Sequence, residues 1–366
     1  MKFHVIQARY GDCFILEYGI KSKPKFMLID GGPARVFDNY LKPELEYIAS
    51  KGGDLDVVAL SHVDRDHVTG LLNFFVELRE NDADEKDRLI GVDDLWINSF
   101  DKAIDVENEI ESALNRVFSN SPHNKTVLRN TGISLDSIKE GNRLKLLARA
   151  LDIPINKKFK GKLVTVDKFK KPFKLGNITI QIVGPTQKNL DELKQDWIDW
   201  FKDHEDKLND RNPSIAGYTD KTAPNLSSLM FLVSHKKKTI LFTGDGRGDH
   251  LIEGLEMIGK FKNNKFCVDV LKIGHHGSDH NVTPEFFEQI RAKTYVISGD
   301  GSNDNPEFST LKWIVEAAKK REEKITLYVT NKTENVDKLL DEFDPKEFDY
   351  ELYYLSNDTT SMEVEF

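Results

Sequence analysis

Four side chains that can bind a metal ion occur within six residues of this chain, in the run His62-Val63-Asp64-Arg65-Asp66-His67. The run follows residues 57–60, an apolar stretch whose composition predicts a buried strand. Imidazole nitrogens and carboxylate oxygens are ligands for divalent cations, and four such groups would be costly to bury without a partner. The chain is therefore expected to fold so that the end of this strand carries a polar site.

Three further polar clusters follow predicted strands: Asp30-Gly31-Gly32, Gly244-Asp245-Gly246 and His275-His276-Gly277-Ser278. In layered α/β folds, sites gather where strand ends meet loops, and glycine allows the backbone to approach a ligand closely. Each cluster alone is ambiguous, because a Gly-Asp-Gly segment is more often a turn than a ligand. Their shared placement in one chain predicts a metal site.

The order of the predicted elements indicates an α/β layer structure. Helices are expected around 37–50, 103–118, 138–151, 187–208 and 309–320. Residues 101–160 are interpreted as a mostly helical insertion within a single domain that spans residues 1–366. Strands are expected around 3–6, 14–18, 26–29, 57–60, 95–97, 178–183, 229–233, 239–243, 268–273, 295–298, 325–329 and 362–366.

Composition limits the classes of function. The formal net charge of −9 provides no global attraction for nucleic acid, although the lysine-rich stretch from Lys157 to Lys174 can form a local basic patch. Cys13 and Cys267 do not suggest a disulfide framework, and both are expected to be buried. With no long apolar segment at the N-terminus or elsewhere, the chain is expected to be cytoplasmic and without a membrane partner.

Together these motifs resemble those of metallo-β-lactamase-fold hydrolases, and more narrowly the branch that includes the hydrolase domain of the DNA-uptake protein ComEC. The family's His-x-His-x-Asp-His motif matches residues 62–67, with Asp64 in place of the second histidine, a replacement typical of that branch. Asp30, the segment 241–245 and the His-His-Gly-Ser segment 275–278 also match. The resemblance covers nearly the whole chain. It implies a four-layer αβ/βα sandwich of two mixed sheets flanked by helices, with the helical insertion at one edge.

The resemblance also implies a ligand set for two divalent ions. One ion would be held by His62 and Asp64, and the other by Asp66, His67 and one of the adjacent histidines, with Asp245 shared between the ions. His276 is slightly favoured over His275. Because Asp64 replaces an imidazole and no third-motif histidine is evident, Mn²⁺ or Mg²⁺ is favoured, and Zn²⁺ stays an alternative. By the same resemblance Asp66, with His67 and Asp64, carries the catalysis, and Asp66 is the expected partner of the attacking water.

Further residues are candidates for contacts with substrate or for accessory roles. Lys272 can reach a phosphate or, equally, be a solvated strand residue. A loop in which relatives carry Gly-His-Pro reads Asp304-Asn305-Pro306 here, so a histidine contact to substrate is expected to be missing or supplied by His280. The full set of accessory candidates is Asp30, Asn225, Ser228, Lys272, Ser278 and His280.

Three functions follow as hypotheses. The first is a metal-dependent phosphodiesterase, most specifically a nuclease, which would need a positive groove for its nucleic-acid substrate. The second is a hydrolase of a small phosphoester or another metabolite, which the acidic net charge favours slightly. The third is an effector subunit that acts with a protein partner in a larger complex, for example in defence, with the insertion and the Trp197-Trp200-Phe201 cluster as its docking face.

Overall fold

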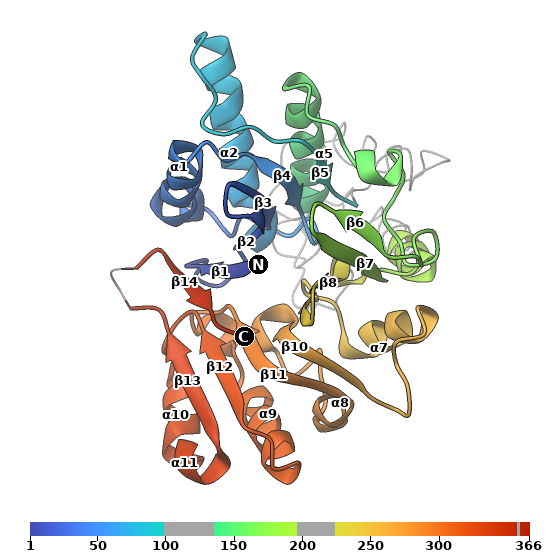
Figure 1. Cartoon of the computed structure of the whole chain (residues 1–366), viewed down its shortest axis with the longest axis vertical. Coiled ribbons are helices and arrows are strands. Elements are labelled where there is room, and N and C mark those ends of the chain that lie inside the picture. The colour runs from blue at the N-terminus through green and yellow to red at the C-terminus, as the bar shows by residue number, and fades with distance from the viewer. Residues whose placement is uncertain (99–134, 196–223, 357–358) are drawn as a thin grey trace, which may run out of the picture.

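The computed structural model describes residues 1–98, 135–195, 224–356 and 359–366, and their strands form two sheets (Figure 1). The smaller sheet has the order β14-β1-β2-β3-β4-β5. Its first and last strands in sequence pair with each other, Phe3 opposite Val364, so the two ends of the chain meet in one sheet. Its bounds are β1 (Lys2–Ile6), β2 (Phe14–Ile20), β3 (Lys23–Ile29), β4 (Leu55–Ala59), β5 (Leu95–Trp96) and β14 (Ser361–Val364).

The larger sheet has the order β13-β12-β11-β10-β9-β8-β7-β6 and is antiparallel from β6 to β9, then parallel from β9 to β13. Its parallel strands read as short apolar runs, as expected for strands covered on both faces. Its bounds are β6 (Phe173–Leu175), β7 (Ile178–Gly184), β8 (Met230–His235), β9 (Lys238–Phe242), β10 (Phe266–Lys272), β11 (Ile290–Ile297), β12 (Ile325–Val329) and β13 (Tyr350–Tyr354).

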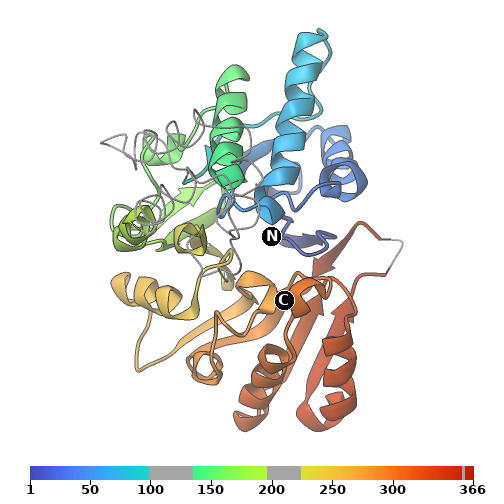
Figure 2. The ribbon, with the colours of Figure 1, turned by 180° about the vertical axis from the view of Figure 1, so that it is seen from behind.

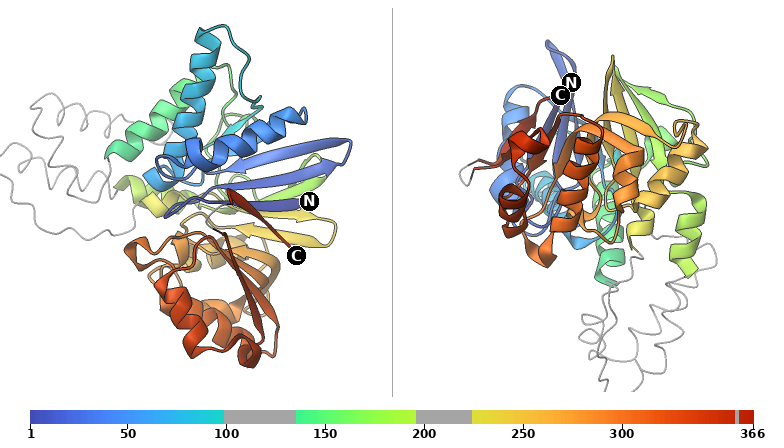
Figure 3. Two further views of the ribbon diagram at one scale, coloured as in Figure 1. Left: turned by 90° about the vertical axis from the view of Figure 1, so that its left-hand side faces the viewer. Right: turned by 90° about the horizontal axis from the view of Figure 1, so that it is seen from below.

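Helices cover the outer face of each sheet, which gives four layers (Figure 3, left). On the smaller sheet lie α1 (Lys42–Ser50), α2 (Arg65–Ala83) and α5 (Leu135–Ala150), with α2 and α5 side by side (Figure 2). The larger sheet is covered by α7 (Gly248–Met257), α8 (Pro284–Gln289), α9 (Phe308–Lys320), α10 (Glu334–Glu342) and α11 (Pro345–Phe348). The predicted four-layer αβ/βα architecture is confirmed.

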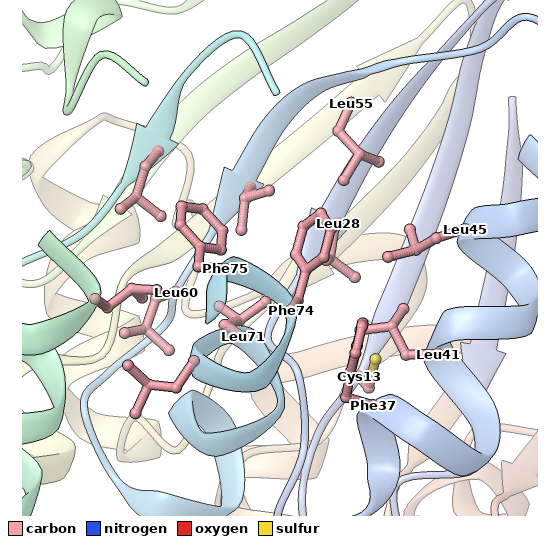
Figure 4. Close-up of a cluster of buried hydrophobic side chains, with 14 of the residues drawn as sticks. Cys13, Leu28, Phe37, Leu41, Leu45, Leu55, Leu60, Leu71, Phe74 and Phe75 are labelled. Carbon is pink, nitrogen blue, oxygen red and sulfur yellow. The ribbon is translucent and has the colours of Figure 1, made fainter. Parts of the chain in front are cut away.

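Three apolar cores hold the layers together. Between the sheets, Phe242 is stacked on Phe231 and meets Phe3 edge to face, and all three rings are buried. Beneath the helices of the smaller sheet lies a second core, in which Phe74 and Phe75 of α2 pack against strand residues such as Leu28 (Figure 4). A third core fills the space between the larger sheet and its helices. Burial of this apolar surface on both faces of each sheet is the main force that fixes the layers.

The strand predictions are close to the observed elements, but several features differ. Helices α2, α7, α8, α10 and α11 and the short strands β6 and β13 were not among the predicted elements. Cys267 is exposed, so the expectation that both cysteines are buried is wrong for it. It is the second residue of β10, a strand that becomes fully buried only over its last three residues. Of the predicted insertion, α5 is described and packs against α2, whereas residues 99–134 lie outside the described residues, as does the predicted helix at 103–118. Within the described chain, no helix is both long and apolar enough to cross a membrane.

Candidate metal centre

The polar clusters singled out in the sequence meet where parallel strands of both sheets end. Strand β4 leads to His62, and the first turn of α2 carries Asp66 and His67. From the larger sheet, Asp245 follows β9 and His276 follows β10. Sites in α/β folds commonly form beyond the carboxyl ends of parallel strands, and these side chains meet at that position.

Helix α2 is seated on the loop after β3 by a close backbone contact. A Cβ atom added to Gly70 would lie only 1.8 Å from the carbonyl oxygen of Gly31, so a larger residue cannot fit there without a shift. The loop is also tied to the first turn of α2, because Gly31 N donates to His67 O at 2.8 Å. Gly31 and Gly70 therefore allow the start of α2 to pack closely against this loop, which holds His67 beside the strand ends.

Three imidazoles converge on one carboxylate oxygen. The Nε2 atoms of His62, His67 and His276 lie 3.8, 3.3 and 3.4 Å from Asp245 Oδ2. Two further carboxylates close the ring: Asp66 Oδ2 lies 3.0 Å from His276 Nε2, and Asp64 Oδ2 lies 3.4 Å from His62 Nε2. The six side chains come from three segments, namely the loop after β4 with the first turn of α2, the loop after β9 and the loop after β10. They form a cluster that is buried except on the side of Asp64 and Asp66.

The groups behind the imidazoles fix which nitrogen carries the proton. The Nδ1 atom of His276 lies 3.0 Å from the backbone oxygen of Ser298, which can only accept. His67 Nδ1 lies 2.9 Å from Asp30 Oδ2. Ser61 Oγ donates to the same Asp30 oxygen at 2.7 Å, so it accepts from His62 Nδ1 at 3.0 Å.

When the three rings are neutral, each therefore holds its proton on Nδ1 and presents the lone pair of Nε2 to the cluster. This is the arrangement by which groups behind the ligands orient metal-binding histidines. Asp30 serves two ligands at once, because it receives His67 directly and His62 through the Ser61 hydroxyl.

Electrostatics in the metal-free cluster are dominated by mutual stabilisation of opposite charges. Burial alone would lower the pKa of His67, but the carboxylates of Asp245, Asp66 and Asp30 together raise it well above its ordinary value. The pKa of His276 is raised in the same way, against burial, chiefly by Asp245 and Asp12. Conversely, burial alone would raise the pKa of Asp245, and the facing imidazoles of His67 and His276 hold it well below its ordinary value.

The residues fit a divalent cation. Within the described part of the chain, the buried Nε2 atoms of His62 and His67 have no hydrogen-bond partner, and neither does Asp245 Oδ1. Buried polar atoms without a partner are costly, and three imidazoles with three carboxylates form a donor set that suits Mn²⁺, Zn²⁺ or Mg²⁺. A second trio, Asp12, Asp30 and His67, also brings ligand atoms within 4.8 Å of one another. There the Lys272 ammonium contacts Asp12, and a cation already occupies that side.

The two adjacent histidines point in different directions. Both have backbone φ angles in the left-handed region, 48° for His275 and 54° for His276, within a tight turn that runs from His275 to Gly277. Strained backbone of this kind is concentrated at functional sites. The turn directs His276 into the cluster, whereas His275 Nδ1 lies 2.8 Å from Asn281 Oδ1 and 3.4 Å from Asn225 Nδ2.

The structure brings some of the predicted accessory residues to the cluster and leaves others at its rim. Asp30 lies behind His67, and the Ser228 hydroxyl accepts from the backbone N–H of Asp245 at 3.2 Å. Ser278 is buried beside Glu307, at an Oγ–Oε1 distance of 3.4 Å, and does not contact the imidazoles. The side chain of His280 is 82% exposed and pairs with Asp279, so it stands outside the cluster.

Lys272 is neither solvated nor free to reach a substrate phosphate. It is 1% exposed, contacts the Asp12 carboxylate and donates to Gly244 O at 2.8 Å. The sequence interpretation missed Asp12, Ser61 and Ser298, all of which lie directly behind the imidazoles. A signal for Asp12 existed, because it is an acidic residue next to the apolar start of a predicted strand, after a glycine.

The fold and the cluster define the class of this protein: it is a four-layer αβ/βα sandwich with a candidate divalent-metal centre at the strand ends. No family model matches the chain. A stretch of 86 residues is 35% identical to ComE operon protein 3 of Bacillus subtilis (strain 168). This stretch is 23% of the chain, and the match covers 10% of that protein's length.

Similar solved structures include the metallo-β-lactamase fold protein YhfI from Bacillus subtilis, with 13% identity, a TM-score of 0.40 and 99% of both chains covered. Zn²⁺-bound PqqB from Methylobacterium extorquens has 10% identity and a TM-score of 0.40, with both chains covered completely. A diphosphatase from the PhnP family has 12% identity and a TM-score of 0.39, covering 100% of this chain and 98% of that one. These similarities do not bear on substrate or metal.

Proposed function

We propose that this protein is a metal-dependent hydrolase and, more narrowly, a phosphodiesterase that cleaves nucleic acid. The observation that carries the proposal is the convergence of three imidazole Nε2 atoms on Asp245 Oδ2, two of them without a hydrogen-bond partner among the described residues. A scaffold has no need of such a cluster, because buried polar groups without partners destabilise the fold.

In this proposal, His62 and Asp64 would hold one divalent ion, Asp66, His67 and His276 would hold a second, and Asp245 would contribute to both. When bound, such ions lower the pKa of a coordinated water and stabilise the negative charge that develops on a phosphoryl oxygen. The donors include three carboxylates, and oxygen-rich sites favour Mn²⁺ or Mg²⁺, with Zn²⁺ as the alternative.

The protein's own part in the reaction is to orient the attacking water. Asp66 suits this role, because its side chain is 24% exposed and reaches the open side of the cluster. Burial alone would raise its pKa, but His67 and His276 lower it, so the carboxylate is ionised at neutral pH and can accept a hydrogen bond. Asp30 and Ser61, behind the imidazoles, keep the Nε2 lone pairs of His62 and His67 directed inward.

A nucleic-acid substrate requires a positive surface, which the stretch from Lys157 to Lys174 can provide. Phe159, within this stretch, is buried in the core between the sheets. Lys158 Nζ donates to the backbone oxygen of Lys174, which joins the two ends of the stretch. Phosphate contacts dominate the affinity of such complexes and make it depend on salt. Replacing several of these residues by Glu is expected to weaken DNA binding and to flatten its salt dependence. The exposed lysines are Lys157, Lys158, Lys160, Lys162, Lys168, Lys170, Lys171 and Lys174.

The deciding experiment measures cleavage of single-stranded, double-stranded and supercoiled DNA and of RNA. Metal-free protein is resupplied separately with Mn²⁺, Mg²⁺ or Zn²⁺, and the double variant Asp66→Ala, His67→Ala is the control. Cleavage with Mn²⁺ that the control lacks is the expected result. If the protein binds metal but cleaves no polynucleotide with any of the three ions, the proposal that it is a nucleic-acid phosphodiesterase is wrong.

A second candidate is the hydrolysis of a small phosphoester, and one observation favours it. A pocket of about 220 Å³ between α7 and α8 is lined by Arg247, His280 and Asn281. It lies beside the loop that carries Asp245, because Asn281 Nδ2 donates to the backbone oxygen of Asp245 at 3.0 Å. Activity on small phosphoesters without activity on polynucleotides would select this candidate. The docking face predicted around Trp197, Trp200 and Phe201 lies outside the described residues, and a protein partner in a larger complex stays a prediction.

A further inference from the structure

A buried ion pair joins the two sheets directly behind the metal-binding cluster. Asp12, in the turn before β2, is completely buried, and Lys272, at the end of β10, is 1% exposed. The Lys272 ammonium contacts Asp12 Oδ2. Removing two charges from water costs several kcal/mol for each ion, and such pairs are often no more stabilising than apolar residues of the same size. Stability alone is therefore a poor reason for this pair.

The lysine end of the pair contacts the carboxylate on which the imidazoles converge. Lys272 Nζ donates to Gly244 O at 2.8 Å and lies 3.6 Å from Asp245 Oδ1. The other oxygen, Asp245 Oδ2, faces the imidazole Nε2 atoms. One oxygen of the Asp245 carboxylate thus faces Lys272, and the other faces the cluster.

The aspartate end of the pair lies on the outer side of two imidazoles. Asp12 Oδ1 is 3.4 Å from His276 Nδ1, and Asp12 Oδ2 is 3.9 Å from His67 Nδ1. A negative charge on this side favours a proton on Nδ1 and makes Nε2 a better ligand, as carboxylates behind metal-bound histidines do. The pair therefore touches both a carboxylate and an imidazole of the cluster without facing its open side.

We propose that Asp12 and Lys272 act together as positioning residues, which turn Asp245 Oδ2 and His276 Nε2 toward a bound divalent ion. The inference rests on the proposed metal-dependent function, since it assigns a role toward the same site. It differs from a simple charge effect. By charge alone, loss of the Asp12 carboxylate would weaken cation binding, and loss of the Lys272 ammonium would strengthen it.

The test measures Mn²⁺ binding by titration calorimetry for the wild type, Asp12→Asn, Lys272→Met and the double variant. Each single variant is expected to bind Mn²⁺ about 10- to 100-fold more weakly, which is the usual effect of losing a group behind a metal ligand. The double variant is expected to bind Mn²⁺ no more weakly than the weaker-binding single variant, because the two residues act as one unit. The electron paramagnetic resonance signal of the bound Mn²⁺ should also change, since its ligands are reoriented.

A matched control is the pair Lys25 and Asp56, which joins β3 and β4 at the ends of these strands away from the cluster. The double variant Lys25→Met, Asp56→Asn should leave Mn²⁺ affinity and the resonance signal unchanged, even if it lowers the melting temperature. If Asp12→Asn or Lys272→Met fails to fold, Asp12→Glu and Lys272→Arg keep the charges but shift them. Positioning requires that these variants also lose affinity.

Two results overturn the inference while the proposed function stands: unchanged Mn²⁺ affinity in both single variants, or weaker binding in Asp12→Asn with tighter binding in Lys272→Met. Wild-type protein that binds Mn²⁺ but hydrolyses nothing would overturn the proposed function and leave the positioning role intact. If the wild type binds neither Mn²⁺, Mg²⁺ nor Zn²⁺, both are wrong.

Discussion

Asp30→Asn changes a single atom and should reverse the proton arrangement behind the cluster. The Asp30 carboxylate accepts three hydrogen bonds, from Ser61 N at 2.7 Å, from Ser61 Oγ at 2.7 Å and from His67 Nδ1 at 2.9 Å. An asparagine side chain has one acceptor oxygen and one donor NH₂ group. If the oxygen keeps the backbone N–H of Ser61, the NH₂ group faces His67 Nδ1 and the Ser61 hydroxyl.

His67 must then accept at Nδ1 and carry its proton on Nε2, which blocks the nitrogen that faces Asp245. The loss of a group behind a metal ligand lowers affinity by about 10- to 100-fold, which corresponds to about 1.4–2.7 kcal/mol. The loss of a hydrogen bond to a charged group should also lower the free energy of unfolding by about 1.5–3 kcal/mol. Titration calorimetry with Mn²⁺ measures the first effect, and urea unfolding of metal-free protein measures the second.

The control is Asp269→Asn, because this carboxylate also accepts from a backbone N–H and a hydroxyl, both of Thr239 at 2.9 Å, but does not contact the cluster. It should lower stability and leave Mn²⁺ affinity unchanged. Nitrogen-15 NMR of the imidazoles of Zn²⁺-treated protein reports which nitrogen of His67 is protonated. Unchanged affinity in Asp30→Asn, together with a proton still on His67 Nδ1, would refute the reasoning.

Two further predictions concern pH and packing. The pKa values of His67 and His276 are raised well above 6.5 in the metal-free protein, so protons compete with the metal ion for these imidazoles. Metal binding should therefore weaken as pH falls through these pKa values and should release protons. Calorimetry in buffers of different ionisation enthalpy detects this release. The same pKa shifts stabilise the metal-free fold, fully below pH 6.5 and progressively less as pH rises through the folded-state pKa values. Melting temperatures of chelated protein that show no such loss with rising pH would contradict the raised pKa values of His67 and His276. Phe242→Ala removes a buried ring that packs on Phe231 and Phe3 and should cost about 3–5 kcal/mol in urea unfolding, whereas a loss near 0.5 kcal/mol, typical of surface sites, would mean that this core is not packed as described.

Local sequence patterns predicted much of the fold because strands covered on both faces carry recognisable apolar runs. Residues 268–273 and 325–329 correspond to β10 and β12 almost completely. Other elements lacked such a signal. Helix α2 begins inside the metal-binding motif, so its polar first turn concealed its start, and β13 places exposed tyrosines at a sheet edge where burial imposes no pattern.

The sequence by itself determined which loops carry candidate metal ligands, since an imidazole or carboxylate beside a glycine at a strand end depends only on neighbours along the chain. Only the tertiary structure decided how these groups are used. It turned His276 inward and His275 toward Asn281, buried Lys272, and brought Asp12 behind the imidazoles. These outcomes depend on contacts between loops that are far apart in sequence, such as Asp12 and Lys272. Which buried charges pair depends on which strand ends lie next to each other in the fold, and a local sequence pattern does not contain that information.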